Sequence, residues 1–279
     1  MKNGEANQLI DMTPWAMQCL MDTIAASEFW AAAISSTDRP AANPPHLQIP
    51  QIQIPQIQLW QTELDRTEEE LQYLSSLLSK DEKARAQRLK NQIHQQRFIA
   101  ARGLLRLLIA TQLHEKPDRL QFTYTNQGKP QLSYPALPYL HFNLSHAQNR
   151  VLYAISTHHP IGVDLEPLKP MQDALALAQR FFTPAEAATI AALPDHERSH
   201  FFLRYWTCKE AYLKATGDGL GKIQQLEIQL ARSIAHSLSR HPLLHPATVT
   251  QAPPKAPLGQ IWELHFAADW VGAIALLSP

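Results

Sequence analysis

The sequence predicts an α+β fold with two similar lobes, residues 56–160 and 161–279, behind an N-terminal extension of residues 1–55. Two observations predict it. Segments typical of strands and segments typical of helices are mixed in each of the two longer ranges. The extension instead ends in a tract of glutamine, isoleucine and proline. No internal sequence identity relates the two ranges, so the two-lobe prediction rests on the type and order of their elements.

The N-terminal extension is predicted to form one or two helices within residues 9–33 and a linker over residues 35–55. The linker carries Pro40, Pro44 and Pro45 before the near-repeat Gln-Ile-Pro-Gln-Ile-Gln-Ile-Pro. Proline at this density is incompatible with a helix interior and with a central strand, which favours an extended, polyproline-like chain. Nothing in the composition assigns a role to this extension.

The first lobe is predicted to open with a strand followed by helices. Leu71, Leu74 and Leu78 recur at a helical spacing, and Asp81 is expected to cap the next helix. The predicted elements are a strand over 57–64, helices over 67–78, 81–88 and 95–113, and strands over 121–124, 139–144 and 151–156.

The second lobe is predicted to alternate in the same way. Thr183, Pro184 and Glu186 stand in the order of an N-cap, an N1 proline and an N3 glutamate, and Gly217 and Gly219 are expected to end a long helix. The predicted elements are a strand over 161–165, helices over 171–182, 183–193 and 200–215, strands over 226–230, 260–266 and 271–277, and a surface loop over 235–258.

The composition is that of a globular protein without a strong charge. Hydrophobic residues make up 45% of the 279 residues, and 25 basic residues balance 25 acidic ones. This balance gives no general attraction to nucleic acid or to a membrane, and no apolar run is long enough to span a bilayer. The N-terminus lacks the continuous apolar segment of a signal peptide. With only Cys19 and Cys208, a disulfide framework is not expected, which fits a reducing cytoplasm.

Four charged residues are the first candidates for a functional site. Asp164 and Glu166 lie two residues apart and therefore on one face of a predicted strand. Glu210 and Lys214 lie one turn apart on one face of a predicted helix. Together they could hold a magnesium ion, which prefers oxygen ligands, and a ligand that carries phosphate. Taken alone, however, Glu210 and Lys214 also fit an ordinary exposed i, i+4 ion pair.

Weaker candidates lie upstream of these residues. Ser145 and His146 follow a short predicted strand, where phosphate binding is a better interpretation than a nucleophilic pair, because adjacent strand residues point to opposite faces. Lys129 stands in a glycine-lysine-proline turn that also suits an ordinary turn. A basic helical region with few acidic partners nearby is formed by Arg85, Arg88, Arg97 and Arg102, and it also fits a solvated helix face.

From about residue 56, the chain resembles the Sfp-type 4′-phosphopantetheinyl transferases. Gly-x-Asp-x-Glu together with Trp-x-x-Lys-Glu-x-x-x-Lys is highly specific, whereas either pattern alone is weak. The resemblance lies in ordered segments: Arg97-Phe-Ile-Ala-Ala-Arg-Gly-Leu-Leu-Arg106, Gly128-Lys-Pro130, Phe142-Asn-Leu-Ser-His146, Gly162-Val-Asp-Leu-Glu166, Trp206-Thr-Cys-Lys-Glu-Ala-Tyr-Leu-Lys214 and Gly217-Asp-Gly-Leu220. The extension of residues 1–55 has no counterpart in that family.

The resemblance implies two α+β lobes related by a pseudo-twofold axis, with coenzyme A in the cleft between them. It also implies transfer of the phosphopantetheine arm of coenzyme A to a serine of a carrier protein of fatty-acid, polyketide or nonribosomal-peptide synthesis, with release of adenosine 3′,5′-bisphosphate. Because the chain is long enough for both lobes, a monomer is expected. The carrier is expected to dock near the cleft rim, where residues 171–193 are a possible contributor.

The resemblance further implies a role for each candidate residue. Magnesium would be bound by Asp164, Glu166 and Glu210, and Glu210 would also be the general base. Catalysis would be assisted by Lys214, which would contact phosphate. Coenzyme A would be contacted by Lys129, Ser145 and His146, and more loosely by Arg85 and Arg97.

Two other functions remain open from the sequence. A non-catalytic carrier-binding homologue would have no need of the four charged residues. A different magnesium-dependent phosphoryl-transfer enzyme is disfavoured, because the sequence contains no Gly-x-x-x-x-Gly-Lys-Ser/Thr loop.

Overall fold

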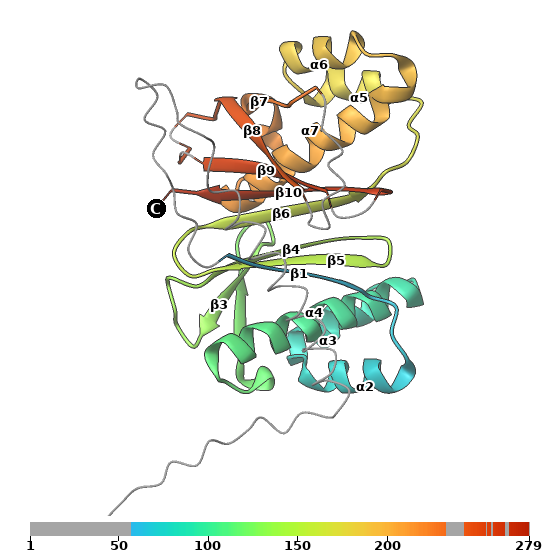
Figure 1. The fold of residues 1–279 in the computed structure, drawn as a ribbon. Coiled ribbons are helices and arrows are strands. Elements are labelled where there is room, and N and C mark those ends of the chain that lie inside the picture. The colour runs from blue at the N-terminus through green and yellow to red at the C-terminus, as the bar shows by residue number, and fades with distance from the viewer. Residues whose placement is uncertain (1–56, 233–242, 255, 258, 266–267, 279) are drawn as a thin grey trace, which may run out of the picture.

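The computed structural model describes residues 57–232, 243–254, 256–257, 259–265 and 268–278. The predicted extension of residues 1–55, with its helices and its linker, lies outside the described residues. Figure 1 shows two lobes stacked on each other, each with a sheet backed by helices. The sheets face each other across the middle of the molecule, and the helices lie on the two outer sides. The predicted α+β fold of two lobes is confirmed.

The first lobe contains a three-stranded antiparallel sheet in the order β1-β5-β4 and a separate hairpin of β2 and β3. Helices α2 and α4 cover one face of the sheet, and α3 and the short helix η1 pack against α4. The bounds are β1 Ile57–Glu63, α2 Glu68–Leu77, α3 Lys80–Gln87, α4 Gln92–Leu113, η1 Pro117–Arg119, β2 Gln121–Tyr124, β3 Pro130–Tyr134, β4 His141–Ala147 and β5 Arg150–Ser156.

The second lobe contains a five-stranded antiparallel sheet in the order β6-β10-β9-β8-β7. The long helix α7 packs along this sheet, and α5 and α6 lie beyond it. The bounds are β6 Ile161–Pro167, α5 Ala174–Phe181, α6 Pro184–Ala191, α7 Asp195–Thr216, η2 Leu220–Gln225, β7 Glu227–Gln229, β8 Leu243–Gln251, β9 Gly259–His265 and β10 Trp270–Leu277.

Alternation along the strands divides the buried residues among three apolar clusters. On β5, Tyr153 packs against the helices of the first lobe, whereas Leu152 and Ala154 point toward the other sheet. On β6, Val163 and Leu165 enter the same cluster between the sheets. The two lobes therefore share a continuous apolar core, which fixes the position of each lobe relative to the other.

Helix caps were predicted with mixed success. Thr183 caps α6 through a capping box with Glu186, as expected. The prediction that Asp81 caps the helix before residue 88 is wrong, because Ser79 is the N-cap and forms a capping box with Glu82. Asp81 lies in the first turn instead, where a negative charge is also favourable.

The predicted surface loop over residues 235–258 is wrong where the structure describes it, because β8 occupies Leu243–Gln251. Proline-rich composition suggested a loop, and Pro246 does lie within the strand. Among the described residues, strand β7 pairs only with the later part of β8, from Thr248 to Gln251, so Pro246 has no partner strand on that side there. An edge position tolerates a residue without an N–H group.

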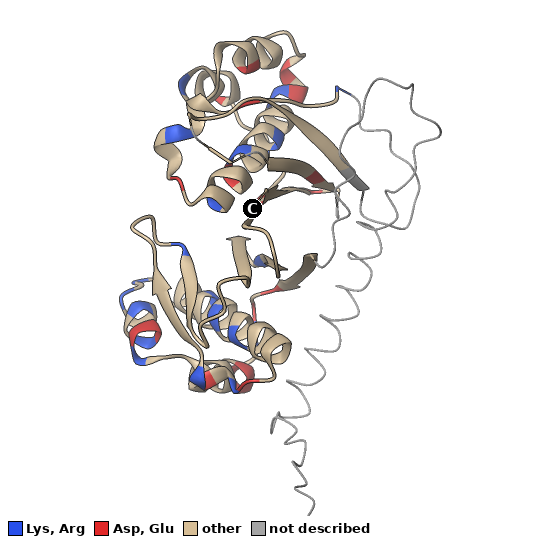
Figure 2. Cartoon of the chain, turned by 90° about the vertical axis from the view of Figure 1, so that its left-hand side faces the viewer, with Lys and Arg blue, Asp and Glu red and all other residues tan. Residues whose placement is uncertain are grey.

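Charged residues are distributed over both lobes. Figure 2 shows lysine and arginine mixed with aspartate and glutamate on the helices and strands, in agreement with the balanced composition. Among the helices of the described residues, none is long and apolar enough to cross a membrane.

Candidate active site

Asp164 and Glu166 project from the face of β6 that meets α7. The neighbouring residues Val163 and Leu165 point the other way, into the apolar cluster between the two sheets. Asp164 is buried at 4% exposure, and Glu166 is half-buried. The alternation that the sequence suggested therefore places both carboxylates between β6 and α7.

Gly162 sets the distance between this strand and α7. A Cβ atom at position 162 would lie 2.0 Å from the carbonyl oxygen of Ala211 and 2.5 Å from the nitrogen of Ala215. Only a residue without a side chain permits such a close approach of two backbones. This contact places the helical turn that carries Glu210 and Lys214 directly over the carboxylates of β6. The sequence analysis quoted Gly162 within a pattern but did not anticipate this role.

Three side chains meet at the centre of the site. The Nζ atom of Lys214 donates to Oδ1 of Asp164 at 2.6 Å and to Oγ of Ser145 at 3.0 Å. The Ser145 hydroxyl also donates to Oδ1 of Asp164, at 2.7 Å. One residue of the first lobe is thus bonded to a strand and a helix of the second lobe. The structure brings together Asp164 and Lys214, which the sequence analysis placed in one candidate site, and Ser145, which it singled out as a weaker candidate.

One oxygen of the central carboxylate remains without a partner. Oδ2 of Asp164 is buried and makes no hydrogen bond within the described part of the chain. A buried carboxylate oxygen is normally paired, because leaving it unsatisfied costs free energy. The atom therefore has free capacity to accept a hydrogen bond or to bind a cation.

Glu210 and Glu166 have raised pKa values in this environment. Burial raises the pKa of Glu210 to about 7. The charge of Lys214 opposes this shift, whereas the charges of Asp164 and Glu166 add to it. Burial and the charge of Asp164 also raise the pKa of Glu166 above its usual range. Three acidic groups around a single ammonium create an excess of negative charge that a divalent cation would relieve.

The donor set suits magnesium, which prefers hard oxygen ligands, and the unpartnered Oδ2 of Asp164 agrees with that preference. Across the described residues, however, no three histidine, cysteine, aspartate or glutamate side chains are gathered closely enough to hold a metal ion. The assignment of Asp164, Glu166 and Glu210 as metal ligands thus stays a prediction.

His146 lies at the edge of the site and is exposed. Desolvation by the surrounding protein, followed by the charge of Lys214, lowers the pKa of His146, and His94 contributes in the same direction. His94, near the start of α4, was missed by the sequence analysis, because a single histidine in a polar helical turn carries no recognisable signal.

Arg85 and Arg97 make contacts within the first lobe. Arg97 forms a bidentate ion pair with Asp65, at 2.7 and 3.0 Å. The Arg85 guanidinium lies 5.8 Å from the ring centre of Phe98 and 5.5 Å from that of Tyr124. The structure does not bond either arginine to the Asp164 network.

The expected shortage of acidic partners in this basic region is wrong. Besides the pair of Arg97 with Asp65, the buried Arg102 donates to Glu82 at 3.0 and 2.8 Å. These partners were not apparent from the sequence, because Asp65 and Glu82 are far from their arginines along the chain.

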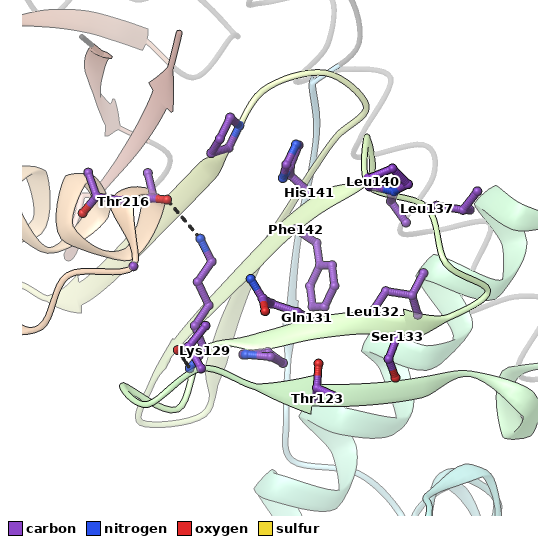
Figure 3. Close-up of a pocket in the computed structure, with 16 residues that line it drawn as sticks. Thr123, Lys129, Gln131, Leu132, Ser133, Leu137, Leu140, His141, Phe142 and Thr216 are labelled. Carbon is purple, nitrogen blue, oxygen red and sulfur yellow. Dashed lines mark hydrogen bonds between the residues drawn. The ribbon is translucent and has the colours of Figure 1, made fainter. Parts of the chain in front are cut away.

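Lys129 extends from the β2–β3 hairpin to the end of α7 (Figure 3). Its ammonium donates to the carbonyl oxygens of Lys214, of Ala215 at 3.2 Å and of Ile161 at 3.4 Å. It also lines a cavity of about 520 Å³ between the hairpin, β4 and the end of α7. None of the three carboxylates lines that cavity. The structure therefore places the Lys129 ammonium next to the backbone of Lys214.

Comparison with known proteins gives a consistent family. Residues 160–271 match the model of the 4′-phosphopantetheinyl transferase superfamily, and residues 60–158 match the model for the N-terminal part of 4′-phosphopantetheinyl transferases. The chain is 48% identical over 164 residues to the 4′-phosphopantetheinyl transferase HetI of Nostoc sp., covering 58% of this chain and 69% of the relative.

Two further relatives agree. The chain is 43% identical to the putative 4′-phosphopantetheinyl transferase slr0495 of Synechocystis sp., over 52% of this chain and 59% of the relative. It is 31% identical to the 4′-phosphopantetheinyl transferase Sfp of Bacillus subtilis, over 55% of this chain and 66% of the relative. The alignments thus span between about three fifths and two thirds of these relatives.

Proposed function

The chain belongs to the 4′-phosphopantetheinyl transferase superfamily, and we propose that it transfers the 4′-phosphopantetheine arm of coenzyme A to a serine of an apo carrier protein. The observation that carries this proposal is the contact of Ser145, Asp164 and Lys214 across the two lobes, beside Glu210. This contact places the Asp164 carboxylate, the Lys214 ammonium and the proposed base Glu210 close together in the fold.

In the proposed reaction, the hydroxyl oxygen of the carrier serine forms a bond to the phosphorus that bears the pantetheine arm. The bond from that phosphorus to the bridging oxygen of the pyrophosphate breaks. Adenosine 3′,5′-bisphosphate leaves with the electron pair, and the serine proton passes to a base. Because the leaving group is a stable anion, most of the catalysis comes from positioning and from neutralising charge.

Glu210 is the proposed base. A serine hydroxyl is a weak nucleophile at neutral pH and needs a partner that accepts its proton. The pKa of Glu210, raised to about 7 chiefly by burial, is close to the value at which a general base works best at neutral pH. General base catalysis of this kind contributes about 10²–10⁴-fold to the rate.

Lys214 is proposed to hold the phosphate groups and to balance the charge that develops on them. Its side chain is 30% exposed, so it can reach a ligand while it remains bonded to Asp164. Ser145 and His146 are proposed to contact the same ligand from the end of β4. Arg85 and Arg97 stay proposed contacts of coenzyme A. Lys129 is either a third such contact or a residue that positions α7, and a comparison of Lys129 variants separates the two roles.

Asp164, Glu166 and Glu210 would hold magnesium, which would supply a positive charge to the pyrophosphate when bound. The unpartnered oxygen of Asp164 supports this assignment. Within the protein, the Lys214 ammonium bonds to Asp164, and the pKa values of Glu166 and Glu210 are raised.

The proposal is tested by incubating the chain with coenzyme A, magnesium and an apo carrier, and by measuring the mass of the carrier. A mass increase equal to phosphopantetheine supports transfer. Binding of the carrier without a mass increase would instead support a non-catalytic carrier-binding protein. The assay across fatty-acid, polyketide and nonribosomal-peptide carriers would identify the substrate class.

We also propose that the chain works as a cytoplasmic monomer. The two lobes within one chain and their shared apolar core support a site that needs no second copy. Light scattering coupled to size-exclusion chromatography tests the oligomeric state, and fractionation of cells tests the location.

A further inference from the structure

The β2–β3 hairpin reaches from the first lobe to the second. Its turn is closed by the Thr125 amide, which donates to the Lys129 carbonyl at 3.0 Å, and by the Lys129 amide, which donates to the Thr125 hydroxyl at 3.1 Å. Gly128 adopts a φ of 81°, a left-handed conformation that favours glycine. The turn is therefore well defined, and the Lys129 side chain starts from a fixed backbone.

The Lys129 ammonium binds the end of α7. The last carbonyl groups of a helix have no partner within the helix, and a positive charge near them is favourable. Lys129 donates to two of these carbonyls, those of Lys214 and Ala215, and to the carbonyl of Ile161 at the start of β6. A lysine has three N–H donors, so these contacts use all of them.

A second contact supports the same hairpin position. A Cβ atom at Gly219, just after α7, would lie 3.1 Å from Oε1 of Gln127. Gln127 and Lys129 thus contact the second lobe on either side of the hairpin's turn glycine. Both residues thus contact the segment from Lys214 to Gly219, at and just beyond the end of α7.

We propose that Lys129 is a positioning residue, which ties the first lobe to the end of α7 and to β6 and so fixes Lys214 against Asp164. This differs from a direct contact with coenzyme A, because an ammonium that donates to three carbonyls has no N–H left for a phosphate. The inference rests on the proposed function, since the orientation of Lys214 matters to that reaction. Misplacing a catalytic group by about 1 Å can cost on the order of 10²-fold in rate.

The test compares Lys129→Met, which keeps the length of the side chain but cannot donate, with Lys129→Arg, which can. We expect Lys129→Met to lower kcat about 10–100-fold. The KM for coenzyme A and the Kd for adenosine 3′,5′-bisphosphate, measured by calorimetry, should change less than about threefold, since no ligand contact is lost. Lys129→Arg should recover part of kcat. The exposed Lys116→Met is the matched control and should leave all three quantities unchanged.

Hydrogen exchange of the unliganded protein gives a second readout that needs no turnover. Exchange should accelerate in Lys129→Met over residues 212–219, at the end of α7, and remain unchanged in α4. A rise in KM and Kd at unchanged kcat, with unchanged exchange, would overturn the proposal and assign Lys129 to the ligand. If the wild-type protein showed no transfer, the proposed function would fail, while the exchange result would still decide whether Lys129 holds α7.

Discussion

The Nζ atom of Lys214 lies 2.6 Å from Oδ1 of Asp164, while Oδ2 of the same carboxylate is buried without a hydrogen-bond partner in the described residues. One oxygen of this carboxylate is thus bonded within the protein, and the other oxygen is available to bind a cation or to accept a hydrogen bond. Such an arrangement suits a site that gains a cation from outside. It also explains how a nearly buried aspartate persists between two lobes, because Ser145 and Lys214 satisfy its other oxygen.

The first prediction concerns this carboxylate. Asp164→Asn keeps the size of the side chain but removes its charge and one oxygen. We expect magnesium-dependent transfer to fall on the order of 10²–10³-fold, because a preorganised charge at the reacting groups is lost. Carrier mass measured across a magnesium titration checks this. The exposed Asp118→Asn serves as the control. Near-wild-type activity of Asp164→Asn would remove Asp164 from the proposed metal site.

The second prediction concerns the pH dependence of stability. Burial raises the pKa of Glu210 from 4.5 to about 7, so the folded protein keeps the proton at pH values where the unfolded chain has lost it. Glu210 should therefore contribute a fall in the free energy of unfolding of the metal-free protein as the pH rises from about 4.5 to 7, whereas His141 and His146, whose pKa values are lowered, contribute in the opposite direction. Glu210→Gln should remove this decrease and be more stable than wild type above pH 7, by on the order of 1–3 kcal/mol.

Urea unfolding in the presence of a chelator, from pH 4.5 to 8, measures this difference. The exposed Glu69→Gln should follow the wild-type curve. Parallel curves for wild type and Glu210→Gln would show that Glu210 titrates normally in the folded protein.

Much of the site could be predicted from the sequence, because its parts follow local periodicity. Asp164 and Glu166 share a strand face, and Glu210 and Lys214 share a helix face, as alternation and the helical repeat require. The α+β fold of two lobes was also predictable from the order of elements. The meeting of Ser145 with Asp164 was not derivable from spacing, because it depends on how two sheets from different lobes stack.

Contacts between distant parts of the chain could not be predicted from the sequence. The Lys129 ammonium, in a glycine-lysine-proline turn, bonds to carbonyls of the other lobe, and its contact with a phosphate of coenzyme A stays a prediction. Strand β8 was predicted as a loop, because proline content indicates local preference and not position in a sheet. Tertiary contacts decided both cases, and those contacts link residues that are distant in the sequence.

The third prediction concerns the close approach of β6 and α7. Gly162→Ala would place a methyl group 2.0 Å from the Ala211 carbonyl oxygen, so the helix must move away from the strand. We expect a loss of stability of about 1–3 kcal/mol or more from overpacking, and a loss of transfer because Glu210 and Lys214 move with the helix.

The matched control for this variant is Gly221→Ala, since a Cβ atom there would have nothing within 4 Å. Thermal unfolding and carrier mass measure the two effects. If Gly162→Ala had wild-type stability and activity, α7 would not need this contact to position the site.

The last prediction concerns the buried ion cluster that supports the first lobe. Glu82 accepts from Arg102 at 2.8 Å and from Arg106 at 2.7 Å, and all three side chains are almost completely buried. Removing the charge of Glu82 leaves two guanidinium groups without their acidic partner in an apolar environment. Breaking a buried pair in this way costs about 3–5 kcal/mol, so Glu82→Gln should lower the free energy of unfolding by that amount.

Because Glu82 has no bond to the Asp164 network, the folded fraction of this variant should keep its rate of transfer. Urea unfolding and carrier mass, measured at a temperature where the variant is folded, separate the two quantities. The exposed Glu69→Gln again provides the comparison on a neighbouring helix. A variant that was as stable as wild type would show that Arg102 and Arg106 are satisfied without Glu82, for example by the carbonyls of Pro117 and Leu120 that Arg106 already contacts.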